Sequence, residues 1–357
     1  MKQAIIFLIG VASWSLIGGC SPDKTQESSI PAQILVLSRS QEQRQESNQM
    51  FPIKQNLKWG YIDSTGQITI KPQFEEVTGF HEKLAAAKIE GLWGFINSNG
   101  EWVIPPKFEE VSRFSEGVAG VKINNKWGFI DSNGKIIIKS QYEQISDFSE
   151  DRAAVTVDGD VGFIDKSGNT VIEPQFHEAW DYKNGLAGVK IRQPRSQSDL
   201  TDTDKWGFID RSGQQVIPLR FGWVSSFSEG LADVSIEGKF GFIDSSGQIA
   251  IAPQFDAASG FSEGLAAVGI NHKWGYIDHR GQMVIKPQFN VALDFHEGLA
   301  AVKINHKWGY IDRRGQMVIK PQFDLTPGFF QGLAWVEVGA KFGYIDSTGK
   351  FVWTPTN

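Results

Sequence analysis

The sequence predicts an all-β fold in which about nine units of 34 residues follow one another, each folded as a three-stranded β-meander. The first observation is a pair, Trp or another hydrophobic residue followed by Gly, that recurs mostly at a spacing of 34 residues. The second is a hairpin signal in each unit, Asp or Asn followed three residues later by Gly. The third is a composition with 38 Gly and 25 Phe, which is typical of short strands joined by tight turns.

The unit that begins near residue 299 shows the order of its elements. Residues 299–304 and 308–311 read as two strands joined by a short turn, and residues 316–319 read as a third. Pro321 ends the third strand because proline cannot donate to a β-ladder. Because one such unit buries little surface alone, neighbouring units must stack. We expect an elongated or superhelical array; the alternative is a closed β-propeller, which typically has four to eight four-stranded blades.

The first 19 residues have the features of a signal peptide. Lys2 precedes an apolar run from Ala4 to Ile17, which is short for a membrane span. The segment Ile17-Gly18-Gly19-Cys20 resembles the lipobox of bacterial lipoproteins, which implies diacylglyceryl modification of Cys20, the only cysteine. The alternative is an ordinary signal peptide with an incidental cysteine. Lipidation would anchor the protein at the outer membrane or at another extracytoplasmic membrane face. The resemblance to enterobacterial lipoproteins implies the outer membrane, because Ser21 rather than Asp follows Cys20.

Three further segments follow from the sequence. Residues 20–56, rich in Ser, Gln and Glu, are predicted to be a lipidated N-terminus and a flexible tether. Residues 57–357 form the predicted repeat domain. A polar insertion at 193–204 lengthens one repeat by 11 residues, and we interpret it as a recognition loop with the polar residues Arg195, Asp199, Asp202 and Asp204.

The Trp-Gly pairs are predicted to build the core of the repeats rather than to bind ligands. Val161, Phe240 and Phe342 replace Trp in three units, and they conserve hydrophobic volume but no indole N–H. Gly beside Trp lets a neighbouring backbone approach closely. The core pairs are Trp59 and Gly60, Trp93 and Gly94, Trp127 and Gly128, Trp206 and Gly207, Trp274 and Gly275, and Trp308 and Gly309.

Two repeated polar positions have a structural and a functional interpretation. The Asp of each hairpin loop suits a turn that accepts backbone N–H groups, whereas calcium binding needs several more oxygen ligands. A Glu in the motif Phe-Ser-Glu-Gly-Leu-Ala either accepts backbone N–H groups or forms an acidic ladder for cations or basic peptides. These residues are Glu82, Glu116, Glu150, Glu229, Glu263 and Glu297.

We predict no catalytic residue, cofactor or metal site. Catalysis needs several different side chains close together at one site. A repeat instead places the same side chain many times along a surface. His272 and His306 occupy equivalent positions in adjacent units, but a metal needs three or four convergent ligands, so ordinary turn residues are favoured. The formal net charge of −6 argues against binding to nucleic acid.

Residues 57–353 resemble the WG-repeat family, also called KWG repeats. The shared marks are Trp-Gly-[Tyr/Phe]-Ile-Asp, the hairpin Gly, Pro-x-Phe and Phe-Ser-Glu-Gly-Leu-Ala. The resemblance implies β-rich repeats that are frequent in exported bacterial proteins, and it transfers no catalytic residue. We therefore expect a non-catalytic envelope lipoprotein that binds a protein or glycan along its repeats. The alternatives are a structural spacer and, less favoured, a hydrolase of envelope polymers.

Overall fold

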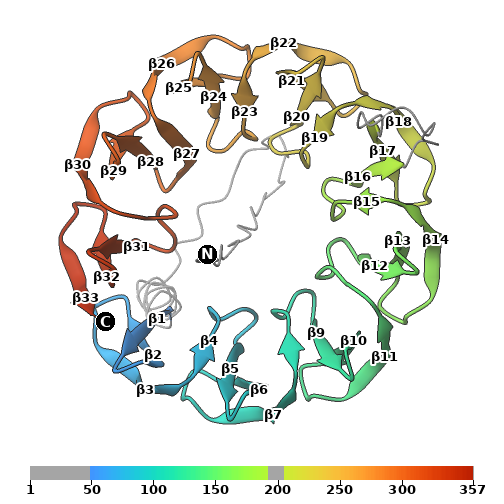
Figure 1. Ribbon diagram of the computed structural model, residues 1–357, viewed down its shortest axis with the longest axis vertical. Coiled ribbons are helices and arrows are strands. Elements are labelled where there is room, and N and C mark those ends of the chain that lie inside the picture. The colour runs from blue at the N-terminus through green and yellow to red at the C-terminus, as the bar shows by residue number, and fades with distance from the viewer. Residues whose placement is uncertain (1–48, 192–204, 357) are drawn as a thin grey trace, which may run out of the picture. The chain divides into compact units, whose positions relative to one another are not determined.

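The computed structural model describes residues 49–191 and 205–356, which form strands and turns. Within these two ranges, no helix is long and apolar enough to cross a membrane. The strands form nine antiparallel sheets in chain order, each made of contiguous residues. We call these sheets blades 1 to 9. A complete blade runs from a short inner strand through a second and a third strand to an outer strand (Figure 1).

The inner strands are β4 (Glu76–Val77), β8 (Glu110–Val111), β15 (Glu178–Ala179), β19 (Trp223–Val224), β23 (Ala257–Ala258) and β27 (Val291–His296). In blades 4 and 9 the single bridges Ile145–Val155 and Leu325–Glu337 take their place. The second strands are β1 (Met50–Gln55), β5 (Ala85–Ile89), β9 (Val118–Ile123), β12 (Ala153–Val157), β16 (Leu186–Ile191), β20 (Leu231–Ile236), β24 (Ala266–Ile270), β28 (Leu299–Ile304) and β31 (Leu333–Val338).

The third strands are β2 (Lys58–Asp63), β6 (Leu92–Ile96), β10 (Lys126–Asp131), β13 (Asp160–Ile164), β17 (Lys205–Asp210), β21 (Lys239–Asp244), β25 (Lys273–Ile277), β29 (Lys307–Asp312) and β32 (Lys341–Asp346). The outer strands are β3 (Ile68–Phe74), β7 (Trp102–Phe108), β11 (Ile136–Tyr142), β14 (Thr170–Phe176), β18 (Gln215–Phe221), β22 (Ile249–Phe255), β26 (Met283–Phe289), β30 (Met317–Phe323) and β33 (Phe351–Thr356).

The nine blades close into a ring, so the expected elongated or superhelical array is wrong and the fold is a nine-bladed β-propeller (Figure 1). Blade 9 packs directly on blade 1: the Tyr344 hydroxyl donates to the carbonyl of Pro52 at 2.9 Å, and the Tyr344 ring contacts Phe51. Most blades also have a fourth strand that the three-stranded prediction lacks. Because the inner strands are short and the outer strands long, each blade is a wedge, and stacked wedges curve until the ends meet.

The ring closes at a seam between blades 1 and 9 that shares no strand. Each blade uses its own stretch of chain, and the seam is packed by Phe51, Ile53, Ile62, Leu333 and Tyr344. The strand β1 belongs to blade 1 and lies within residues 20–56, where we expected a tether. The repeat domain therefore begins before Leu57.

Aromatic rings fill the spaces between consecutive blades, and several of them are the Phe of the motif Phe-Ser-Glu-Gly-Leu-Ala. Phe114 of blade 3 packs on Phe95 of blade 2 at a centroid distance of 4.8 Å, and Phe148 packs on Phe129 at 4.9 Å. The same contact recurs at Phe261 and Phe242, and at Phe329 and Tyr310. Burial of these rings stabilises one blade on the next.

Candidate functional site: an open pocket on blade 8

The residues predicted as repeat core lie in the third strands, where Gly faces a bulge of the outer strand. In blade 3, Trp127 pairs with Tyr142 and Phe129 with Ile138, so two residues of β10 oppose four of β11. The extra residues of β11 bulge toward Gly128, where a Cβ atom would lie 2.5 Å from the carbonyl oxygen of Ile138. The same closeness, 2.4–2.5 Å, occurs at Gly60, Gly94, Gly207, Gly241, Gly275 and Gly309.

The six Trp residues of the predicted core lie at the start of their third strands and are buried or half-buried. Trp206 and Trp308 are the most buried, and Trp59, Trp93, Trp127 and Trp274 are partly exposed. A Lys of the second strand covers the ring in four blades, with Nζ to centroid distances from 5.5 to 5.9 Å, at Trp59, Trp93, Trp127 and Trp308. In blade 5 the ring of Trp180 instead stacks on Trp206 at 5.1 Å.

The hairpin Asp residues hold turns. Asp63 Oδ1 accepts the backbone N–H groups of Thr65 and Gln67 at 2.9 and 3.0 Å, and the other blades repeat this geometry. In blade 6 the Ser246 hydroxyl and backbone N–H groups hold the pKa of Asp244 below its usual value. These bonds support the turn interpretation over calcium binding. Among the residues described, no group of three His, Cys, Asp or Glu side chains could hold a metal ion.

The six Glu residues of the repeated motif link each blade to the next. Each accepts a backbone N–H from the equivalent hairpin of the following blade. For example, Glu82 binds the N–H of Gly117 at 2.9 Å, and Glu116 binds the N–H groups of Glu150 and Asp151 at 2.6 and 3.0 Å. The six Glu residues are thus hydrogen-bond acceptors between neighbouring blades, which confirms the interpretation that they accept backbone N–H groups.

The opposite side of the ring, which we call the turn face, carries the hairpins between second and third strands and the connectors between blades. In blade 3 both residues that open the blade are acidic. Glu109 accepts the N–H groups of Asn124 and Asn125, each at 2.9 Å, and Glu110 pairs with Lys122 at 2.6 Å. Blade 2 has the same arrangement. Glu75 accepts backbone N–H groups of the hairpin between the second and third strands, and Glu76 pairs with Lys88. These carboxylates close the turn face.

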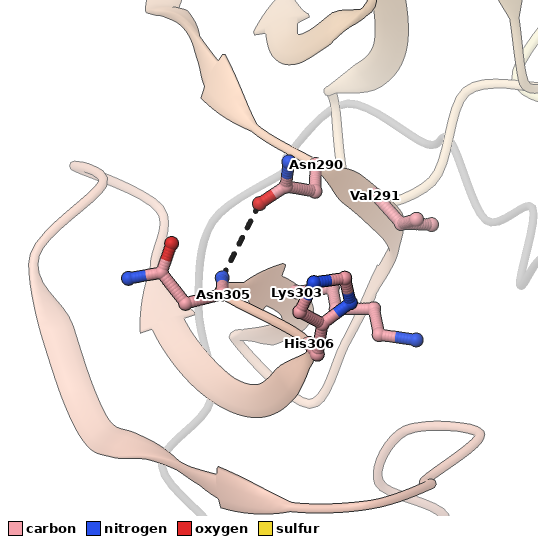
Figure 2. Close-up of a pocket in the computed structure, with 5 residues that line it drawn as sticks. All are labelled: Asn290, Val291, Lys303, Asn305 and His306. Carbon is pink, nitrogen blue, oxygen red and sulfur yellow. Dashed lines mark hydrogen bonds between the residues drawn. The ribbon is translucent and has the colours of Figure 1, made fainter.

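Blade 8 lacks both carboxylates and has a pocket of about 290 Å³ in their place (Figure 2). Asn290 replaces the connector acid and accepts the N–H of Asn305 at a long 3.3 Å. Val291 replaces the acid that would pair with Lys303. The pocket is lined by these four residues and His306, which come from the connector into β27 and from β28 with its hairpin.

Sequence reasoning did not single out Asn290, Val291 or Lys303. The signal was available, since superposing the repeats places Asn290-Val291 where blades 2 and 3 have Glu-Glu. His306 lines the pocket and, like His272, its equivalent in blade 7, it is exposed on its hairpin. Cys20 and the predicted loop residues Arg195, Asp199, Asp202 and Asp204 lie outside the described residues. The insertion joins Ile191 to Lys205, which are paired at the turn face of blade 5.

One carboxyl group is buried without a hydrogen bond to one of its oxygens. Asp233, in β20 of blade 6, is 2% exposed, and its Oδ1 has no partner in the described part of the chain. Burial, the largest cause, raises the pKa of Asp233 to about 6, against an opposing hydrogen bond from Ser225; the nearby carboxyl of Asp294 adds to the rise. The charged form of Asp233 therefore destabilises the fold.

We predict that stability falls between about pH 4 and pH 6 because of Asp233. Its folded pKa exceeds the value of about 3.9 in an unfolded chain, so the folded state binds the extra proton in this range. The loss is about 3 kcal/mol as the pH rises through 6, and it is constant above that. Asp233→Asn should flatten the curve of melting temperature against pH from 4.5 to 7.5. Parallel curves for the two proteins would contradict this role.

Eight consecutive stretches of the chain match the family model described as WG containing repeat, at residues 59–93, 93–127, 127–159, 162–193, 206–240, 240–274, 274–308 and 308–342. A search of curated protein sequences finds no match. Among solved structures, apo AztD from Citrobacter koseri is 13% identical, with a TM-score of 0.42 over 86% of this chain and 96% of that chain. Hsv2p from Kluyveromyces lactis is 8% identical, with a TM-score of 0.40 over 65% and 89%. Both likenesses are weak and carry no conclusion about activity. The repeats span most of the propeller, and the chain belongs to the WG repeat family.

Proposed function

We propose that the protein is a non-catalytic binding module of the cell envelope that takes its ligand on the turn face. One observation carries this proposal. In the blades that keep the repeat pattern the polar groups bind one another, whereas blade 8 leaves an open pocket lined by Lys303, His306 and two Asn side chains. A repeated fold whose surface residues vary from unit to unit suits recognition, because loops on a rigid scaffold carry function.

The cellular setting in this proposal comes from the N-terminal sequence. The apolar run before Cys20 supports export, and lipidation of Cys20 would hold the propeller at a membrane on its extracytoplasmic side. The ligand would then be an envelope protein or glycan. No cofactor and no nucleic acid enter the proposal.

A photo-crosslinking amino acid at position 306 tests the proposal in intact cells. The matched control carries it at position 125, the equivalent turn position of blade 3, where Glu109 closes the face. We expect adducts from position 306 in at least several-fold excess over position 125. Equal adduct yields at both positions, or none at either, would refute ligand binding at blade 8.

A structural role in the envelope is the second candidate. It is favoured by the self-contained blades, whose Glu carboxylates join neighbouring blades rather than face a ligand. Restoring the acidic pair in blade 8 with Asn290→Glu and Val291→Glu separates the two. A structural component would keep its cellular phenotype with this closed pocket, and a binding module would lose it.

A further inference from the structure

We propose that the blade 8 pocket binds an anionic sugar, held by Lys303 together with the side chains of Asn290, Asn305 and His306. This inference rests on the proposed function, because it assigns a ligand class to the same face. It follows from lysines that pair with acidic residues in several other blades and have no such partner, among the described residues, around blade 8.

The charge of Lys303 is the first step. The equivalent Lys residues in three other blades each contact a Glu of the inner strand: Lys88 with Glu76 at 2.8 Å, Lys122 with Glu110 at 2.6 Å, and Lys190 with Glu178 at 3.3 Å. Lys303 has the cross-strand partner Val291 instead, and it makes no ion pair within the described ranges. Its ammonium lies 5.6 Å from the centre of the Trp308 ring. A ligand anion would supply the missing counter-charge.

The connector between blades 7 and 8 also lacks an acidic residue that would pair with a lysine. Lys239 and Lys307, the first residues of their third strands, each bind the acid of the next connector, Asp256 at 2.6 Å and Asp324 at 2.5 Å. Lys273 has the same place in blade 7, and its connector carries Asn290 instead of an acid. Two lysines thus lose their carboxylate partners around one connector. The local balance is positive on a chain whose net charge is −6.

The neutral groups give the third step and indicate a sugar. Asn290 and Asn305 carry amides that both donate and accept hydrogen bonds, and an imidazole donates through one nitrogen and accepts through the other when neutral. Sugar hydroxyls need this mixture, whereas a bare inorganic anion uses donors only. Val291 adds an apolar wall for the C–H face of a ring. The volume of about 290 Å³ is at the small end of ligand pockets, which suits one sugar residue.

Calorimetric titration of the folded protein tests the proposal with four probes. Galacturonate is a sugar with a carboxylate, and glucose 6-phosphate is a sugar with a phosphate. Galactose is a neutral sugar, and glutamate has a carboxylate but no sugar ring. We expect galacturonate or glucose 6-phosphate to bind and galactose and glutamate to bind at least tenfold more weakly. Whichever anionic sugar binds more tightly identifies the source of the charge.

Three variants locate the site. Lys303→Gln, and separately the pair Asn290→Glu and Val291→Glu, should each weaken binding of the anionic sugar at least tenfold, since a hydrogen bond to a charged group is lost or the counter-charge is already present. The pair recreates the Glu-Glu of blades 2 and 3, so it should fold. Lys122→Gln, the same change in blade 3, should leave binding unchanged.

Several outcomes overturn the proposal. Galactose binding as tightly as galacturonate removes the role of charge, and glutamate binding as tightly removes the sugar and points to an acidic peptide. Equal losses in Lys303→Gln and Lys122→Gln place the site elsewhere. Absence of binding by every probe refutes the anionic sugar. If crosslinks still form from position 306, the proposed function stands without this ligand; if they do not, both fail.

Discussion

Gly128→Ala should destabilise the propeller by about 3 kcal/mol or more, because the new methyl group would clash with three backbone atoms of the adjacent outer strand. The ideal Cβ position lies 2.5 Å from the oxygen of Ile138, 2.7 Å from the nitrogen of Ser140 and 2.8 Å from the carbonyl carbon of Lys139. No side chain can rotate away, so the bulge of β11 itself must move. Thermal unfolding followed by circular dichroism measures the effect.

Gly222→Ala is the matched control for this prediction. Gly222 is exposed in the connector before β19, and a Cβ atom there would lie 3.7 Å from its nearest neighbours. Its φ is outside the left-handed region, so Ala should change the melting temperature little. Equal losses at both positions would show that the outer strand does not press on Gly128.

Phe51→Ala should open the ring at the seam between blades 1 and 9. Phe51 is 5% exposed and packs edge-on against Tyr344 with ring centres 5.5 Å apart. Truncation of a buried Phe costs about 3–5 kcal/mol. Because no strand is shared across the seam, this packing and the Tyr344 hydroxyl bond hold the two blades together. We expect amide hydrogen exchange to rise selectively in β1–β3 and β31–β33.

Phe148→Ala provides the comparison for the seam. Phe148 packs on Phe129, the residue of blade 3 equivalent to Tyr344, between blades 3 and 4, where the chain runs directly from one blade to the next. Exchange should then rise around these blades and leave the seam protected. A uniform rise in all nine blades for Phe51→Ala would show that the ring unfolds as one unit and does not open at the seam.

The sequence predicted the fold of a single blade better than the arrangement of the nine blades in a ring. The spacing of Trp-Gly pairs and the Asp-to-Gly hairpins located the second and third strands and the start of the outer strands, because these depend on alternation and turn chemistry within about 25 residues. The predicted end of the outer strand at Pro321 is wrong, since β30 runs on to Phe323. The inner strands are only two residues long in most blades, too short for a periodic signal. Ring closure depends on the angle between wedges, a sum of small differences in packing that no single residue encodes.

The candidate site escaped prediction for a related reason. Asn290 and Val291 give no signal by themselves. Their importance follows only from comparison with Glu109 and Glu110, which form hydrogen bonds and an ion pair at the same positions of blade 3. Repetition directed attention to residues that recur, such as Glu116, and these proved to join the blades. His306 was noted for its equivalence to His272, but its position beside Lys303 required the fold.

The seam gives the ring two complementary surfaces that belong to the opposite ends of one polypeptide. A blade 1 surface released from its own blade 9 can meet blade 9 of another molecule through the same contacts of Phe51 and Pro52 with Tyr344. Such a contact is heterologous and repeats head to tail. Protein concentration would then set the balance between closed monomers and open chains of propellers.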